Sequence, residues 1–227
     1  MDNKEIWGKQ AKEWTDLFHN EKSMGSLPNV LKKTDKILDQ GCGIGQYSFT
    51  IYKMGYKNVI GMDFSPKLLK IARENAKKLN YKIKFVEGDI RAMPFKNNSF
   101  DAIISAGIVE HVPETDKTIK ELSRVLKKGG YLFIHVPHQI SAFTLVKIIR
   151  KSLGLWSLGY EKSFTKKGFR RLLEKNNFEI FEFYINEFKP GKHKILGGIL
   201  SLIDKPLYLL GYGGHHLHFL CKNIKKD

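Results

Sequence analysis

The chain has 227 residues, of which 42% are hydrophobic and 27% charged, and its formal net charge at pH 7 is +16. This length is enough for one domain with a substantial core, whereas no apolar run approaches the roughly 20 residues that a membrane-spanning helix needs. The two cysteines, Cys42 and Cys221, lie far apart, and their spacing indicates neither a metal site nor a disulfide framework. Because the first residues lack a signal-peptide pattern, we expect a cytoplasmic protein.

The basic charge has two interpretations. Lysine-rich solvated surfaces alone would produce it, or it would attract nucleic acid, anionic lipid or an acidic small substrate. The lysines are scattered along the chain, so we predict no disordered basic tail.

The first predicted element covers residues 5–33, where apolar side chains recur at helical spacing with an interruption near residues 25–28. Strand and helix patterns then alternate. The predicted strands end at Asp39 and Asp63 and cover residues 83–90, 99–106, 131–136, 178–188 and 217–222, and the predicted helices cover 66–79, 114–126 and 164–176. Residues 127–130 are expected to form a turn. This alternation with short turns predicts a doubly wound α/β domain.

Residues 39–45 read Asp-Gln-Gly-Cys-Gly-Ile-Gly, so glycines fall at every second position after an apolar strand. Glycine at this density lets the backbone turn sharply and lie against a ligand. A second acid, Asp63, closes the next apolar run. Together these features predict a nucleoside-containing cofactor at the carboxyl ends of a parallel sheet.

The pattern Asp39-x-Gly41-x-Gly43-x-Gly45 resembles the first motif of the class I S-adenosylmethionine-dependent methyltransferases. It departs from the G-x-G-x-x-G turn of dinucleotide-binding proteins because position 46 is Gln. The order of motifs over residues 35–140 is similar to that of the quinone-biosynthesis methyltransferases. This resemblance implies a Rossmann-like, seven-stranded, mostly parallel sheet with an antiparallel last strand, and S-adenosylmethionine as cofactor.

The expected cofactor assigns roles to ten residues. The backbone of the three glycines should pass under the methionine part and the ribose, Asp39 should orient the ammonium group, and Asp63 should accept both ribose hydroxyls. Asp89 should accept a hydrogen bond from the exocyclic amine of adenine. The remaining contacts are Phe64 along the adenine face, the Ile90 backbone at the ring edge, and Ala106 and Gly107 at the methionine end.

We expect one domain over residues 1–227, with a cofactor-binding core over 34–140. Trp7, Trp14 and Phe18 fall on one face of the N-terminal segment, here 1–33, which is explained by packing in the core. In the resembling family this segment is also commonly a lid over the cofactor. Two apolar insertions, 141–163 and 189–214, should rise from the rim of the site. They suit an apolar substrate, a membrane surface or a cap, or else a dimer interface or extra core.

His111 follows the fourth strand, and the proton affinity of histidine suits a general base at neutral pH. The alternative is that His111 only packs at the entry to the next helix. The other expected rim residues are Trp14, His138 and Tyr160. His215, His216 and His218 form a cluster, in which only His216 and His218 could share a strand face. We predict no metal site there.

The predicted function is methyl transfer to a small, apolar or membrane-associated acceptor. No Asn/Asp-Pro-Pro-aromatic turn follows Ser105, and no cysteine stands where a cytosine-carbon methyltransferase would place its nucleophile. We therefore expect no specific nucleic-acid substrate. Two alternatives stay open: an NAD-linked oxidoreductase, and a non-catalytic RNA-binding protein that retains the fold.

Overall fold

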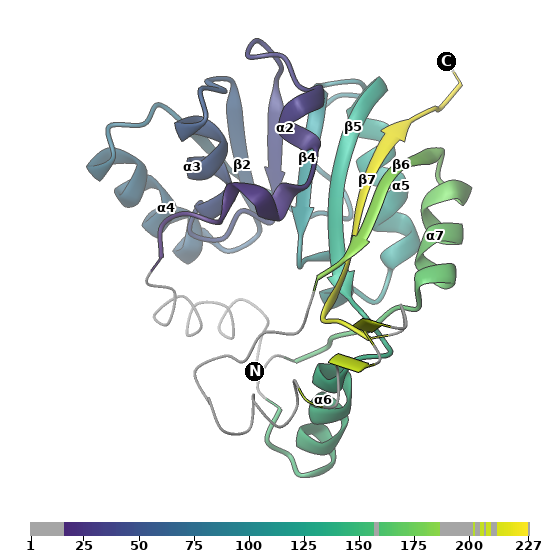
Figure 1. Ribbon diagram of the computed structural model, residues 1–227. Helices are drawn as coiled ribbons and strands as arrows, with labels where there is room; N and C mark the ends of the chain where they lie inside the picture. Colours follow the sequence, from purple (N-terminus) through teal and green to yellow (C-terminus); the bar gives the residue numbers. More distant parts are fainter. Residues whose placement is uncertain are drawn as a thin grey trace.

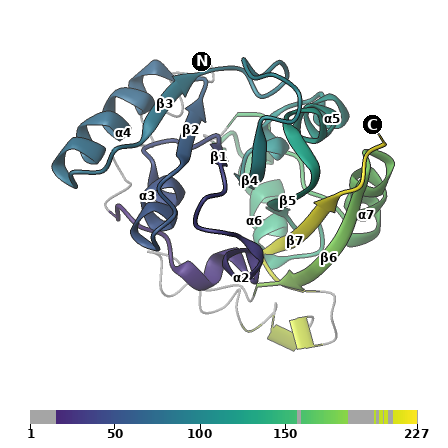
Figure 2. The same ribbon diagram turned by 90° about the horizontal axis from the view of Figure 1, so that it is seen from above.

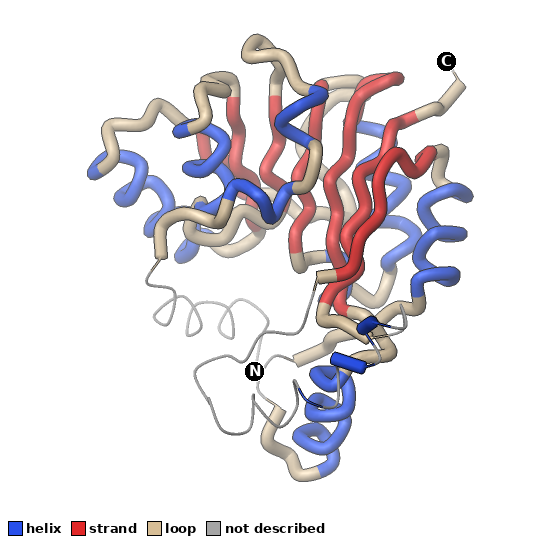
Figure 3. The backbone as a smooth tube through the Cα atoms, in the orientation of Figure 1, coloured by secondary structure: helices blue, strands red, loops and turns tan. Residues whose placement is uncertain are grey.

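The computed structural model describes residues 16–156, 159–186, 202, 205–206, 208–209 and 213–226. Trp7, Trp14 and most of the predicted 189–214 insertion lie outside these residues. The described chain folds around one seven-stranded sheet with the order β3-β2-β1-β4-β5-β7-β6, which Figures 1 and 3 show edge to edge. The strands are β1 (Ile37–Gln40), β2 (Val59–Asp63), β3 (Lys84–Glu87), β4 (Phe100–Ala106), β5 (Leu126–Pro137), β6 (Phe178–Ile185) and β7 (His216–Asn223).

Pairing within the sheet confirms the predicted topology. The strands β3, β2, β1, β4 and β5 are joined in parallel, and β7 runs antiparallel to both β5 and β6. The order reverses at β1, where the chain crosses from β3 back to β4. In an open α/β sheet this switch point, at the carboxyl ends of the strands, is where ligands bind.

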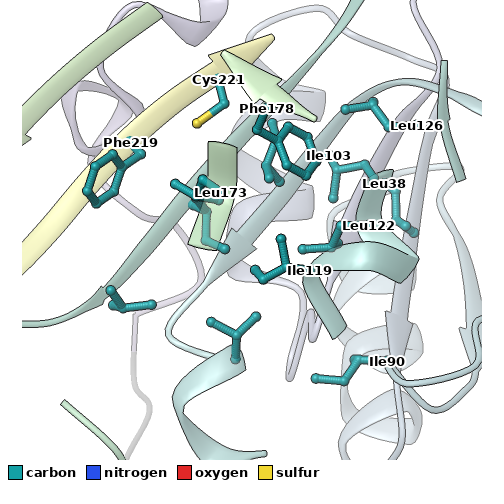
Figure 4. Packing of buried hydrophobic residues seen from close by; sticks show 14 of the residues in the cluster. Leu38, Ile90, Ile103, Ile119, Leu122, Leu126, Leu173, Phe178, Phe219 and Cys221 are labelled. Atoms are coloured by element: carbon teal, nitrogen blue, oxygen red, sulfur yellow. The ribbon is translucent and has the colours of Figure 1, made fainter. Parts of the chain in front are cut away.

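Helices cover both faces of the sheet (Figure 2). They are α2 (Leu27–Val30), α3 (Gln46–Lys53), α4 (Pro66–Lys78), α5 (Thr115–Val125), α6 (Ala142–Ser152) and α7 (Lys166–Lys175), with short 3₁₀ helices η2 (Glu21–Met24) and η3 (Val109–His111). The helices α5 and α7 bury Ile119, Leu122 and Leu173 on one face (Figure 4). On the other face α2 and α3 bury Leu27 and Ile51.

Local sequence explains where several helices begin. Ser65, Ser141 and Thr165 are N-caps whose side chains accept hydrogen bonds from the backbone N–H three residues later. These bonds satisfy amides that have no partner inside the helix. Pro66 then occupies the first turn of α4, where its missing N–H costs nothing.

Several predicted boundaries differ from the structure, among them the strand expected over 83–90, which covers only Lys84–Glu87; the two largest differences are at residues 16–20 and 127–130. Residues 16–20 are not helical, because the Asp16 carbonyl and the His19 N–H bond to side chains of α3 instead of to their own segment. The expected turn at 127–130 lies inside β5 as an irregularity, since Leu126 pairs with Phe100 and pairing resumes with Tyr131 opposite Ala102. Gly129 takes a left-handed conformation there (φ +77°), which glycine adopts without steric cost.

Candidate functional site

The glycine turn after β1 is held against β2. The backbone N–H groups of Gly41 and Cys42 both donate to the carbonyl oxygen of Met62, at 2.7 and 2.9 Å. Gly41, Gly43 and Gly45 have φ values of +72°, +53° and +96°. A side chain is strained in this region of φ, so the three glycines make the turn possible.

Asp39, the acid with which the first motif begins, is buried. Its Oδ2 atom accepts hydrogen bonds from the backbone N–H of Ser48 at 2.8 Å and from its hydroxyl at 2.6 Å. Burial raises the pKa of Asp39 to about 6, against the opposing effect of the Ser48 hydrogen bonds. The carboxyl group thus links β1 to α3 and also faces the cavity described below.

Asp63 joins the ends of β1 and β2. One carboxylate oxygen accepts from the backbone N–H of Gly43 and the other from that of Ser65, each at 2.9 Å. Burial raises the pKa of Asp63, while these backbone hydrogen bonds oppose the rise. Each oxygen keeps a second lone pair for a further donor.

Asp89 lies on the loop after β3 and is more exposed. The guanidinium of Arg91 donates to both of its oxygens, with Nη2–Oδ2 at 2.6 Å and Nε–Oδ1 at 3.0 Å. These hydrogen bonds lower the pKa of Asp89. Arg91 also lies 3.7 Å from Glu114, so an acid–base–acid row borders this side of the site.

These groups surround one cavity of about 390 Å³ at the carboxyl ends of β1, β2 and β4. This volume lies within the range of small-molecule sites. The cavity brings together nine of the ten residues that the sequence assigns to the cofactor, and His111. These nine are Asp39, Gly41, Gly43, Asp63, Phe64, Asp89, Ile90, Ala106 and Gly107.

Sequence reasoning missed further wall residues, namely His19, Cys42, Gln46, Tyr47, Leu68, Arg91, Ile108, Val112 and Pro113. Most of them are chain neighbours of predicted residues in the same βα turns, so proximity in sequence could have found them. His19 could not be found in this way. It reaches the cavity because its ring stacks on Tyr47 at a centroid distance of 3.9 Å.

Three expected residues do not line the cavity. Gly45 is the N-cap of α3, and a Cβ built there would lie 2.7 Å from the ring of Phe49, so its role in the structure is close packing. His138 is buried where α6 begins, and its carbonyl oxygen accepts from the hydroxyls of Ser141 and Thr144. Tyr160 contributes its backbone carbonyl, which contacts His111, while its ring is exposed.

His111, at the end of η3, reaches the cavity wall with its ring orientation fixed. Its Nδ1 atom lies 3.0 Å from the carbonyl oxygen of Tyr160. Burial lowers the pKa of His111, and the Tyr160 carbonyl partly opposes this. The preceding residue, Glu110, is buried with its Oε2 atom unpaired, and burial raises its pKa to about 8.

The predicted histidine cluster extends over two strands. His135 of β5 lies opposite His218 of β7 in the sheet register, with ring centroids 4.9 Å apart. The ring of Tyr184 stacks on His218 at 4.5 Å. Burial lowers the pKa of His218 to about 4. Within the described ranges, no three His, Cys, Asp or Glu residues are arranged to hold a metal ion.

The chemical groups that line the cavity fit the S-adenosylmethionine expected from the sequence. Asp63 and Asp89 offer carboxylate oxygens to hydroxyl and amine donors. Gly41, Gly43 and Gly107 line the same cavity with backbone that carries no side chain.

Comparison with known proteins agrees with this assignment. The sequence family described as a methyltransferase domain matches residues 31–188, which is more than half of the chain. A ubiquinone biosynthesis O-methyltransferase from Pelagibacter ubique is 33% identical over 65% of this chain and 63% of its own length. A sterol 24-C-methyltransferase from Aspergillus fumigatus is 36% identical over 46% of this chain. The match spans only 28% of that sterol relative, so the chain corresponds to part of these proteins.

Solved structures share the fold at low sequence identity. An S-adenosylmethionine-dependent methyltransferase from Thermotoga maritima has a TM-score of 0.69 at 18% identity, with coverage of 96% of this chain and 99% of that chain. A second, from Methanosarcina mazei, has a TM-score of 0.66 at 22% identity and covers 89% of this chain and 98% of that one. Together with the domain match over residues 31–188, this fold shows that the chain belongs to the class I S-adenosylmethionine-dependent methyltransferases.

Proposed function

We propose that this protein transfers a methyl group from S-adenosylmethionine to a small, apolar acceptor. The observation that carries the proposal is the meeting of the glycine turn, Asp63 and Asp89 on the wall of one cavity. When bound, S-adenosylmethionine supplies a methyl group already activated on a sulfonium, so the protein has mainly to hold and orient the acceptor.

Three carboxylates would hold the cofactor. Asp63 would accept hydrogen bonds from the ribose hydroxyls. Its oxygens have lone pairs for them besides those that accept from the N–H groups of Gly43 and Ser65. Asp89 would accept a hydrogen bond from the adenine amine while it stays paired with Arg91, which lines the same cavity. Asp39, which is buried, would orient the ammonium group.

We assign the general base to His111. A carbonyl oxygen only accepts hydrogen bonds, so in the neutral ring the proton sits on Nδ1, next to Tyr160. Nε2 is then the basic nitrogen of the ring. Because burial lowers the pKa of His111, the neutral form prevails at pH 7 and is able to take a proton from the acceptor.

Apolar side chains support an apolar acceptor. Ile108, Val112 and Pro113 line the cavity beside His111. The relatives described above are named for sterol and ubiquinone chemistry. An acceptor of that type, a lipid-soluble ring compound, suits these walls better than a nucleic-acid base. The proposal places the reaction in the cytoplasm, with peripheral membrane contact.

Cofactor binding is the first test. Titration of the intrinsic fluorescence with S-adenosylhomocysteine, and separately with NADH, should give saturable binding for the first ligand only. Incubation with an isotopically methyl-labelled donor and a cell extract should then label a compound that partitions into organic solvent. Binding of NADH alone would favour an oxidoreductase and overturn the proposal. Salt-sensitive RNA binding without any labelled product would favour the non-catalytic alternative.

A further inference from the structure

The helix α6 has its polar and apolar sides reversed relative to a normal surface helix. It leaves the carboxyl end of β5 and projects beyond the edge of the sheet that bears the cavity (Figure 1). Lys147, in its middle, is buried, whereas Leu145, Ile148 and Ile149 are 50%, 59% and 49% exposed. A surface helix normally does the opposite, because burial of apolar surface is favourable and burial of charge is costly.

Specific contacts fix this orientation. The Nζ atom of Lys147 lies 3.0 Å from Oε1 of Glu161, and each side chain of the pair is 5% exposed. Lys147 also donates to the hydroxyl of Ser163, which contacts Thr144 on the same side of α6. The polar side of α6 is therefore bonded to residues 161–163, which turns its apolar side outward.

Exposed apolar residues continue past the end of the helix. We define the α6 face as the exposed apolar residues Leu145, Ile148, Ile149, Leu153 and Leu155. Arg150 and Lys151 are exposed beside it. The sequence contains no acidic residue between Glu121 and Glu161, so α6 and the segment that follows it up to Tyr160 contribute only positive charge.

We propose that the α6 face inserts into the interface of a bilayer that contains anionic lipid. Apolar side chains flanked by Lys and Arg, on a helix too short to span the bilayer, are the features of an interfacial helix. None of the described helices is long and apolar enough to cross a membrane, so the contact is peripheral. The inference rests on the proposed function in one respect. Membrane contact would bring the cavity to the lipid phase, where the proposed apolar acceptor dissolves.

A second copy of the chain suits this face less well. In a two-fold interface the same patch meets itself, so Arg150 and Lys151 would approach their own copies, and α6 and the segment that follows it up to Tyr160 contain no acid to pair with them. The cores of protein interfaces are depleted of charged residues. An anionic lipid surface instead satisfies both the apolar and the basic part of the face.

Vesicle co-sedimentation tests the inference. The protein should bind vesicles in which phosphatidylglycerol makes up about one third of the lipid, and should bind pure phosphatidylcholine at least tenfold more weakly. The double variant Leu145→Gln/Ile148→Gln should lose at least tenfold in partitioning to the mixed vesicles. Ile224→Gln is the matched control, because Ile224 is 53% exposed and directly follows β7, whose C-terminal end lies away from α6 (Figure 1). It should bind like the unmodified chain.

Equal binding of both vesicle types, or binding that survives the double variant, would overturn the inference. So would a concentration-dependent dimer that the double variant abolishes, because the face would then be covered by a second copy. Titration with S-adenosylhomocysteine separates this test from the proposed function. A chain that binds the nucleoside but no vesicles contradicts only the membrane inference, and a chain that binds vesicles but no nucleoside contradicts only the methyltransferase proposal.

Discussion

The backbone N–H of Gly43 donates to the Asp63 carboxylate at 2.9 Å, and this bond ties the glycine turn after β1 to the tip of β2. Asp63 therefore has two roles: it fixes the glycine turn, and it lines the cavity. The turn and its acid are a single unit, although 20 residues separate them along the chain.

Asp63→Asn should weaken binding of S-adenosylhomocysteine by about 100-fold. The amide has a single acceptor oxygen, whereas Gly43 and Ser65 donate to different oxygens of the carboxylate. Loss of a charged hydrogen bond costs about 1.5–3 kcal/mol. Isothermal titration calorimetry would measure the change. Glu174→Gln, an exposed site on α7, is the control, and an unchanged affinity in Asp63→Asn would contradict the assigned role.

Gly41→Ala should destabilise the fold more than Gly154→Ala. Both glycines have positive φ values, +72° and +67°, but a Cβ at Gly41 would lie 2.4 Å from the side chain of Ile108, whereas a Cβ at Gly154 meets nothing within 4 Å. Backbone strain should cost each variant about 1 kcal/mol, and the forced movement of Ile108 should add about 1–3 kcal/mol to Gly41→Ala. Urea unfolding would compare them. Equal losses would mean that Ile108 moves aside without cost.

Lys147→Met should lower the free energy of unfolding by about 3–5 kcal/mol, because Glu161 would be left as an uncompensated buried charge. The double variant Lys147→Met/Glu161→Leu should recover most of this loss. Lys175→Met breaks an exposed pair with Asp116 and should change stability by no more than about 1 kcal/mol. Guanidinium unfolding of the three variants tests the contrast, and a small effect of Lys147→Met would show that water reaches the pair.

Acidification should destabilise the protein in part through His218. Its pKa is about 4 in the folded chain, where burial lowers it from an ordinary value of 6.5. Between these two values the unfolded chain binds more protons, so stability falls as the pH falls from about 6.5 to 4, by about 3 kcal/mol for this group. His218→Phe keeps a ring against Tyr184 and removes the titration. The difference in unfolding free energy between the two proteins should therefore change over this window and stay constant above pH 7.

His111→Gln should reduce the rate of methyl transfer by about 10²–10⁴-fold while leaving the affinity for S-adenosylhomocysteine within about threefold. The reason is that His111 is assigned to the acceptor's proton and not to the cofactor. Single-turnover rates with the labelled donor would measure this once an acceptor is identified. A loss of nucleoside binding of the same size as the rate loss would show instead that His111 is a packing residue.

The carboxyl-edge residues were predictable because the βα turns of a parallel sheet bring short sequence motifs to one edge. The glycines, Asp63 and Asp89 each stand at or just after the end of a predicted strand. Nine of the ten assigned residues line the cavity. His19 carried no such signal. Its place depends on stacking against Tyr47 and on the bond from its N–H to Thr50.

The sequence by itself determined the order of the strands along the chain, the helices near 66–79, 114–126 and 164–176, the glycine turn and the acids at the strand ends, because these features depend on local backbone conformation and on the alternation of apolar residues. Only the tertiary structure decided which side of α6 faces outward. Its apolar residues alone favour burial against the core, but the ion pair of Lys147 with Glu161 lies inside instead. That choice depends on a partner 14 residues away, and helical periodicity within α6 contains no information about it.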